Sequence, residues 1–281
     1  MKTNRSLIKG LVASGMAMAV VSSLVAQTPI QHAATVVRIV GHARYKAAGM
    51  EWQTLRVGDL IKPGTIIQTS KEPDGKAYVD LSLEGGAAPD VRTGPKPMDA
   101  APAAFSATHP PSLLGYHASA GQNVVRIFDN TALGVDKLSA MDTGAGTVTD
   151  TELDLKTGHI FVNVKKMTAG SRYEVKMPNG VAGIRGSAVH FFAEGVIWTG
   201  PNTRVTAAYM DNNNQAVTTD MTDDSALDMR TGALSTLPPT DISFIDALIR
   251  DTSYFAGVTQ LLSYSPDFTC NHPMSFNNLG P

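Results

Sequence analysis

The sequence is poor in cysteine and in charge, and each shortage excludes a class of protein. Its 281 residues include one cysteine, so the chain can form no internal disulfide and no structural zinc site built on several cysteines. Charged residues make up 17% of the chain and the formal net charge is −2, which gives no electrostatic reason to expect nucleic acid as a partner. Apolar residues reach 43%, so the composition is that of a folded chain with a real core.

A long apolar run without charge lies near the N-terminus. A short basic head precedes the apolar segment Leu11–Val25, and the small residue Ala26 follows it. About 15 apolar residues are fewer than the 20 or so that a membrane span needs, and this layout is typical of a secretory signal. We therefore predict a signal peptide over residues 1–26, export to the periplasm or cell surface, and no membrane span in the mature chain. An uncleaved anchor remains the alternative, because Leu24 is larger than signal peptidase prefers three residues before the cut. Cleavage removes three basic residues and no acid, which leaves a net charge of −5.

The middle of the chain alternates apolar and polar residues in short runs, which is the pattern of half-buried strands. The runs are Val36 to Tyr45, Ala77 to Leu83, Ile160 to Val164, Tyr173 to Met177 and Val205 to Tyr209. Turn-forming Gly, Pro, Asn and Asp residues separate them. This pattern predicts an all-β fold of stacked short hairpins, as a β-roll or a short solenoid or sandwich, over residues 35–235.

Two segments depart from the strand pattern. Residues 86–121 are rich in Pro and Ala and show neither period, so we interpret them as a surface insertion, with a binding loop as the alternative. Residues 238–281 predict a helical tail that packs on the β domain, with a first helix capped by Thr240 or Asp241 and a short second helix from Phe255 to Leu262. The single cysteine, Cys270, lies in this tail and is expected to be unpaired, although pairing with another chain stays open.

A search for catalytic or metal-binding patterns gives structural interpretations instead. No pair among the seven histidines has helical metal-ligand spacing, and His159 and His190 are interpreted as structural residues in strands. Asp211–Gln215 resembles the start of a calcium loop, but the glycine and the closing glutamate are missing, so the segment is predicted to be a hairpin turn. The nearby acids are interpreted as a solvated edge with weak cation affinity: Asp220, Asp223, Asp224 and Asp228.

The segment Gly180–Ser187 has three glycines at intervals of three residues. It lacks the lysine of a phosphate-binding loop, and no helix is expected to follow it. Gly180, Gly183 and Gly186 are therefore expected to serve bends or close approaches of the backbone. Ile184 and Arg185 lie between them, and Arg185 is expected to find an acceptor within the fold. We predict no catalytic residue, no cofactor and no metal site.

These residues also carry a family resemblance. The segment from Lys165 to Met167, followed by Ser171 to Ser187, resembles the FecR-domain family, and Met177 and Ser187 replace threonines that are usual there. Blocks between Glu51 and Thr69 are similar to the opening hairpins of that family. Val124–Ile127 and Leu153–Ile160 fit its middle strands, so the resemblance spans roughly Val36 to Gly232.

The resemblance implies an all-β periplasmic module whose founding members relay a receptor signal to a sigma factor across the inner membrane. We expect this chain to be a stand-alone exported member, because the basic head before Leu11 is too short for an anti-sigma segment and the sequence shows no second apolar span of about 20 residues. The expected function is non-enzymatic sensing or scaffolding through contacts with an unidentified envelope protein. The alternative is an envelope glycan-binding module, for which aromatic rings suit sugar stacking. Its candidate residues are Trp52, Tyr116, Trp198 and Tyr209.

Overall fold

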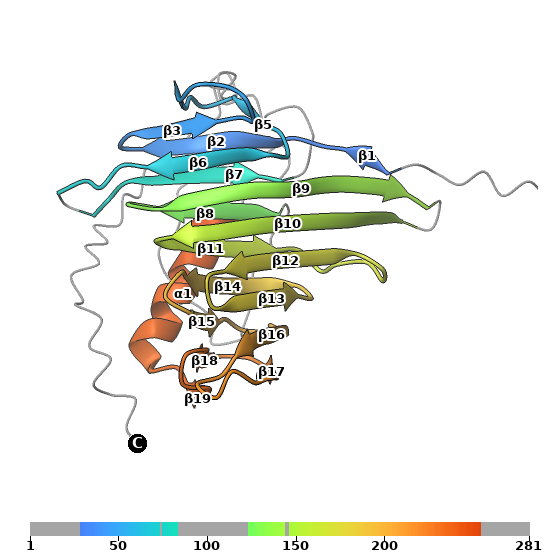
Figure 1. Cartoon of the computed structure of the whole chain (residues 1–281), viewed down its shortest axis with the longest axis vertical. Coiled ribbons are helices and arrows are strands. Elements are labelled where there is room, and N and C mark those ends of the chain that lie inside the picture. The colour runs from blue at the N-terminus through green and yellow to red at the C-terminus, as the bar shows by residue number, and fades with distance from the viewer. Residues whose placement is uncertain (1–28, 74, 84–122, 144–145, 254–281) are drawn as a thin grey trace, which may run out of the picture.

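A computed structural model describes residues 29–73, 75–83, 123–143 and 146–253, which form two stacked β-sheets and one helix (Figure 1). The ten strands of the first sheet, sheet A, are β1 (Ile30–Gln31), β3 (Ala43–Lys46), β4 (Gln53–Thr54), β6 (Thr65–Thr69), β9 (Ala132–Asp142), β10 (Thr147–Thr157), β12 (Arg172–Met177), β13 (Gly180–Ile184), β16 (Val205–Met210) and β17 (Ala216–Met221). The nine strands of the second sheet, sheet B, are β2 (Ala34–Val40), β5 (Leu60–Ile61), β7 (Tyr78–Ser82), β8 (Val124–Phe128), β11 (His159–Val164), β14 (Ser187–Phe192), β15 (Val196–Thr199), β18 (Ser225–Asp228) and β19 (Ala233–Thr236). The prediction of an all-β domain with a small helical tail is confirmed.

Both sheets have their N-terminal strands toward one edge and their C-terminal strands, β17 and β19, at the other. Hairpins fall alternately in the two sheets: β9–β10, β12–β13 and β16–β17 in sheet A, and β7–β8, β14–β15 and β18–β19 in sheet B. Pairing is antiparallel throughout the described strands except between β10 and β12, which are parallel. The fold is thus a sandwich made by stacking hairpins, as the turn spacing predicted.

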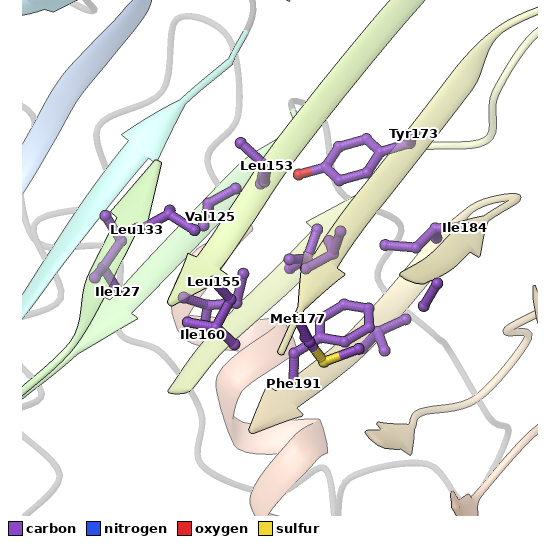
Figure 2. Packing of buried hydrophobic residues seen from close by; sticks show 14 of the residues in the cluster. Val125, Ile127, Leu133, Leu153, Leu155, Ile160, Tyr173, Met177, Ile184 and Phe191 are labelled. Carbon is purple, nitrogen blue, oxygen red and sulfur yellow. The ribbon is translucent and has the colours of Figure 1, made fainter. Parts of the chain in front are cut away.

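The core lies between the sheets and is built from alternate residues of each strand. Leu133, Leu153 and Leu155 from sheet A face Ile127 and Ile160 from sheet B, all with 0% exposure (Figure 2). β12 and β16 show the period-2 burial that the alternation predicted. On β11, however, Phe161 and Asn163 of the opposite face are also buried, because a helix covers the outer face of sheet B.

That helix, α1 (Pro239–Thr252), packs on β11 and β14 through Ile245, Leu248 and Ile249. Its packing on the β domain is confirmed, but the predicted cap at Thr240 or Asp241 is wrong. Pro238 occupies the N-cap without a side-chain hydrogen bond, and a proline follows at the first helical position, where its fixed φ suits the helix.

The predicted strand from Val36 to Tyr45 is two strands in different sheets. The chain leaves sheet B after Val40 and enters sheet A at Ala43. Gly41 makes the crossing with φ +75°, and a Cβ there would lie 2.8 Å from the Ala77 Cβ. Alternation continued through the turn, so the sequence pattern hid the change of sheet.

Several predictions lie outside the described residues. They concern the signal peptide over residues 1–26, the insertion over residues 86–121, the second helix and Cys270. In the described part of the chain, no helix combines the length and apolar character needed to cross a membrane.

Candidate functional site

The glycine motif forms strand β13 and the crossing from sheet A to sheet B. Gly180 is in close contact with β16, since a Cβ on it would lie 2.3 Å from the Ala208 carbonyl oxygen. Gly183, three residues on, has space: its nearest atom would be the Thr206 carbonyl oxygen at 3.9 Å. The expected close approach is therefore real at Gly180 and absent at Gly183.

The end of the motif supports the loop that joins β11 to β12. Gly186 has φ +127°, which glycine adopts far more readily than other residues, whereas the nearest atom to a Cβ would be the Lys166 Cα at 3.6 Å. The bend, not a close approach, is what requires glycine there. Arg185 is exposed, and its Nη1 donates to the Ser171 carbonyl oxygen at 3.1 Å, which supplies the predicted acceptor. Ile184 is buried in the core and Ser187 begins β14.

The same loop covers a cavity of about 420 Å³ at one end of the sandwich. Strands β9 and β10 run on beyond the neighbouring strands toward β1, as Figure 1 shows, so sheet B does not cover their ends. The cavity occupies this uncovered part of the inner face. Its described lining comes from β9, β10, the β11–β12 loop, His32 and the strand ends at Leu83 and Asn123.

The floor of the cavity carries a row of threonines on β10. Thr147 is exposed, Thr149 is half-buried and Thr151 is 5% exposed, so the row leads inward from the rim. None of their hydroxyls has a hydrogen-bond partner among the described residues. Beside them, Ser171 Oγ accepts from the Thr149 amide at 3.0 Å and lies 2.8 Å from the Thr168 hydroxyl. Lys165 and Lys166 of the loop also line the cavity.

The two strand histidines form an aromatic stack on the outer face of sheet B. His159 Nδ1 lies 2.9 Å from His190 Nε2, and the stack continues to Phe128 and Phe192 with ring centroids 4.4 and 4.3 Å away. Burial lowers the pKa of His159 to about 4 and that of His190 well below its usual value. Phe244 of α1 stacks on His190 with centroids 5.9 Å apart. Both rings are therefore neutral packing groups beneath the helix, in agreement with their structural interpretation.

A charged network fixes the far end of α1 to the same face. Arg126 is 4% exposed and donates to both carboxylate oxygens of Asp80 at 2.7 and 2.8 Å. It also pairs with Asp251 of the helix at 2.6 Å, and Arg38 donates to the Asp251 carbonyl oxygen at 2.8 Å. Tyr78 lies under Arg126, with 4.2 Å between the guanidinium carbon and the ring centroid. Burial of the acid–base pair makes this a structural clamp.

The remaining candidate residues are dispersed. The Asp211 carboxylate accepts from the amides of Asn213 and Gln215 at 2.8 Å, which is a turn and confirms the hairpin prediction. Asp220 accepts from Thr206, Asp223 from the Thr203 amide, and Asp228 pairs with Arg230. Within the described ranges, no three His, Cys, Asp or Glu residues lie close enough together to hold a metal ion.

The three described aromatic residues considered for glycan binding do not share a surface. Trp198 packs beneath α1, and Tyr209 is 5% exposed. Trp52 lies under the Arg44 guanidinium at 4.5 Å, and Tyr116 lies outside the described residues.

Comparison with known families identifies the central part of this architecture. Residues 117–207 match the family model described as FecR protein. Over these residues the chain is similar to the FecR family. The FecR match covers β8 to the start of β16 and includes the glycine motif, the β11–β12 loop and most of the cavity lining. It is shorter than the resemblance from Val36 to Gly232. No curated protein and no solved structure matches the chain.

The cavity was missed from the sequence, although one signal for it was present. Thr147, Thr149, Thr151, Leu153 and Leu155 alternate over the same inner face, and the change from leucine to threonine marks where the dry core ends. What no pattern could reveal is the overhang of β9 and β10 beyond sheet B.

Proposed function

We propose that this chain is an exported, non-enzymatic FecR-domain module that senses or scaffolds through protein contacts in the periplasm or cell envelope. The match of residues 117–207 carries the proposal, because a FecR domain points to a role in signalling or sensing. The basic and apolar layout of residues 1–26 supports export.

The surroundings of the ionisable groups support a non-enzymatic role. A general base must reach a substrate proton, but His190 is 1% exposed and His159 is enclosed by Phe128 and Phe192. Arg126 and Asp80 are both consumed in the clamp under α1. The histidine stack and the Arg126–Asp80 pair contact α1 and hold it on the sheet, so these ionisable groups have a structural role.

Site-specific photo-crosslinking in living cells tests the proposal. A photo-reactive residue replaces one exposed apolar residue at a time at the two ends of the sandwich: Met50, Leu60, Met210 and Leu234. We expect a defined envelope protein to be captured from one end and not from the other. Absence of any adduct at all four positions, with the chain correctly folded and located, would contradict the proposal.

Localisation is tested separately by fractionation. We expect the mature chain in the periplasmic or surface fraction and a mass that shows loss of residues 1–26. A chain retained in the cytoplasm would refute export without bearing on the fold.

A further inference from the structure

The threonine row on β10 marks a change in what one face of a strand contacts. Leu155 and Leu153 are fully buried in the dry core, whereas Thr151, Thr149 and Thr147 continue the same face into the cavity. Thr151 is 5% exposed, Thr149 is half-buried and Thr147 is exposed, so the row runs from the core to the rim of the cavity. Three successive hydroxyls along this face give the cavity a floor that can both donate hydrogen bonds to a polar occupant and accept them from it.

The rest of the lining indicates what kind of polar molecule fits. Lys165 and Lys166 contribute positive charge, and among the described lining residues there is no Asp or Glu. Leu138, Ala140 and Met167 provide an apolar wall beside the hydroxyls. A hydroxyl both donates and accepts, so a row of them suits a partner rich in hydroxyls, while the ammonium groups suit an anion.

We propose that this cavity binds a small polyhydroxylated anion, a sugar acid or sugar phosphate. The threonine row pairs with the ligand hydroxyls, the lysines pair with its carboxylate or phosphate, and the apolar wall contacts its C–H face. A volume of about 420 Å³ is in the range of small-molecule sites. Leu138, Ala140 and Met167 take the place of an aromatic platform, so the site is independent of Trp52, Trp198 and Tyr209.

The family motif lies directly behind this site. Arg185 holds the Ser171 carbonyl, and Gly186 packs against the backbone of Lys165 and Lys166. A ligand in the cavity would therefore contact the β11–β12 loop, which in turn contacts the segment that joins β13 to β14. The biological role of this binding rests on the proposed sensing function. The binding itself does not, because it can be measured on the isolated chain.

The test is calorimetric titration of the purified full chain with four probes. Glucuronate and glucose 6-phosphate carry both the hydroxyls and the charge, glucose lacks the charge, and inorganic phosphate lacks the hydroxyl-bearing body. We expect saturable binding of at least one anionic sugar and binding about tenfold weaker, or undetectable, for the other two. Equal binding of glucose would overturn the role of the lysines, and equal binding of phosphate would overturn the role of the threonines. If neither anionic sugar binds, water is the occupant and the proposal is overturned.

Variants locate the binding site. The double change Thr149→Val with Thr151→Val and the single change Lys166→Gln should each weaken binding about tenfold, the equivalent of one lost hydrogen bond or ion contact. Thr218→Val on β17 and Lys62→Gln are matched controls on exposed positions away from the cavity, and they should leave affinity unchanged. Near-ultraviolet circular dichroism confirms folding of each variant, and Lys166→Gln tests the site even if the valine pair unfolds. Unchanged affinity in a folded cavity variant would show that the ligand binds elsewhere on the chain. If the crosslinking experiment captures no partner while the ligand still binds, only the proposed function is refuted.

Discussion

Two glycines of one strand give the sharpest test of how the motif is built. An alanine at Gly180 places its Cβ 2.3 Å from the Ala208 carbonyl oxygen, over 1 Å inside the 3.4 Å at which ordinary contact begins. Because that oxygen belongs to the backbone of β16, strands β13 and β16 must separate where Gly180 pairs with Tyr209. Overpacking costs about 1–3 kcal/mol, and a buried hydrogen bond lost from the pair adds about 1–3 kcal/mol. We therefore expect Gly180→Ala to lower the free energy of unfolding by about 3 kcal/mol.

Gly183→Ala is the matched control in the same strand. Its Cβ meets nothing nearer than 3.9 Å, and its φ is not positive. Removing glycine reduces the freedom of the unfolded chain, so we expect a gain of about 0.5–1 kcal/mol.

Urea unfolding followed by circular dichroism measures both variants. With a slope of about 3 kcal/mol per molar urea, Gly180→Ala should shift the midpoint down by about 1 M, whereas Gly183→Ala should shift it slightly up. Equal midpoints for the two variants, or a lower one for Gly183→Ala, would refute the contact argument.

Three further predictions concern the helix face and the insertion. The folded chain holds the pKa of His159 at about 4 against 6.5 when unfolded, so the unfolded state binds more protons between these values. The stability that neutral His159 contributes is full above pH 6.5 and falls by about 2 kcal/mol between pH 7.5 and 5, and His190 adds a loss of the same sign. His159→Phe should remove the His159 part of this loss in urea titrations at the two pH values. Asp251→Asn removes a partner of the buried Arg126 and should cost about 2 kcal/mol and speed amide hydrogen exchange in α1, whereas Asp246→Asn on the same helix should change neither. Replacing residues 84–122 by a short turn should leave the melting temperature within a few degrees, because the flanking strands β7 and β8 pair directly; a collapse of the melting transition would show that the insertion is part of the core.

Local patterns predicted the strands well where the contacts that matter are those of one strand face. Alternation located β7, β11, β12 and β16 and the hairpin at Asp211, although only β12 and β16 leave every second residue partly exposed. The same reasoning failed at Gly41, where alternation continued through a change of sheet.

The groups brought together on the helix face were beyond such reasoning. His159 and His190 meet because β11 and β14 pair antiparallel, which sets Phe161 opposite His190. Asp251 reaches Arg126 from a helix more than a hundred residues further along the chain. Each contact depends on strand order and on where α1 lies, and neither is encoded in the spacing of the residues involved.

The stacking of hairpins allows such a chain to change in length without changing its existing strand pairs. The Leu83 amide donates to the Asn123 carbonyl oxygen at 2.9 Å, so the two residues that flank a 39-residue segment are adjacent in the sandwich. Apart from β1, β4 and β5, strand order in both sheets follows chain order, so from β6 onward each new strand pairs with one already in place and leaves earlier pairs unchanged. The architecture can therefore lengthen at its open end, or admit a segment at a hairpin tip, while the strands that shape the cavity and the motif keep their register. A chain of this kind can gain or lose whole hairpins at its end, as repeat proteins gain or lose repeats.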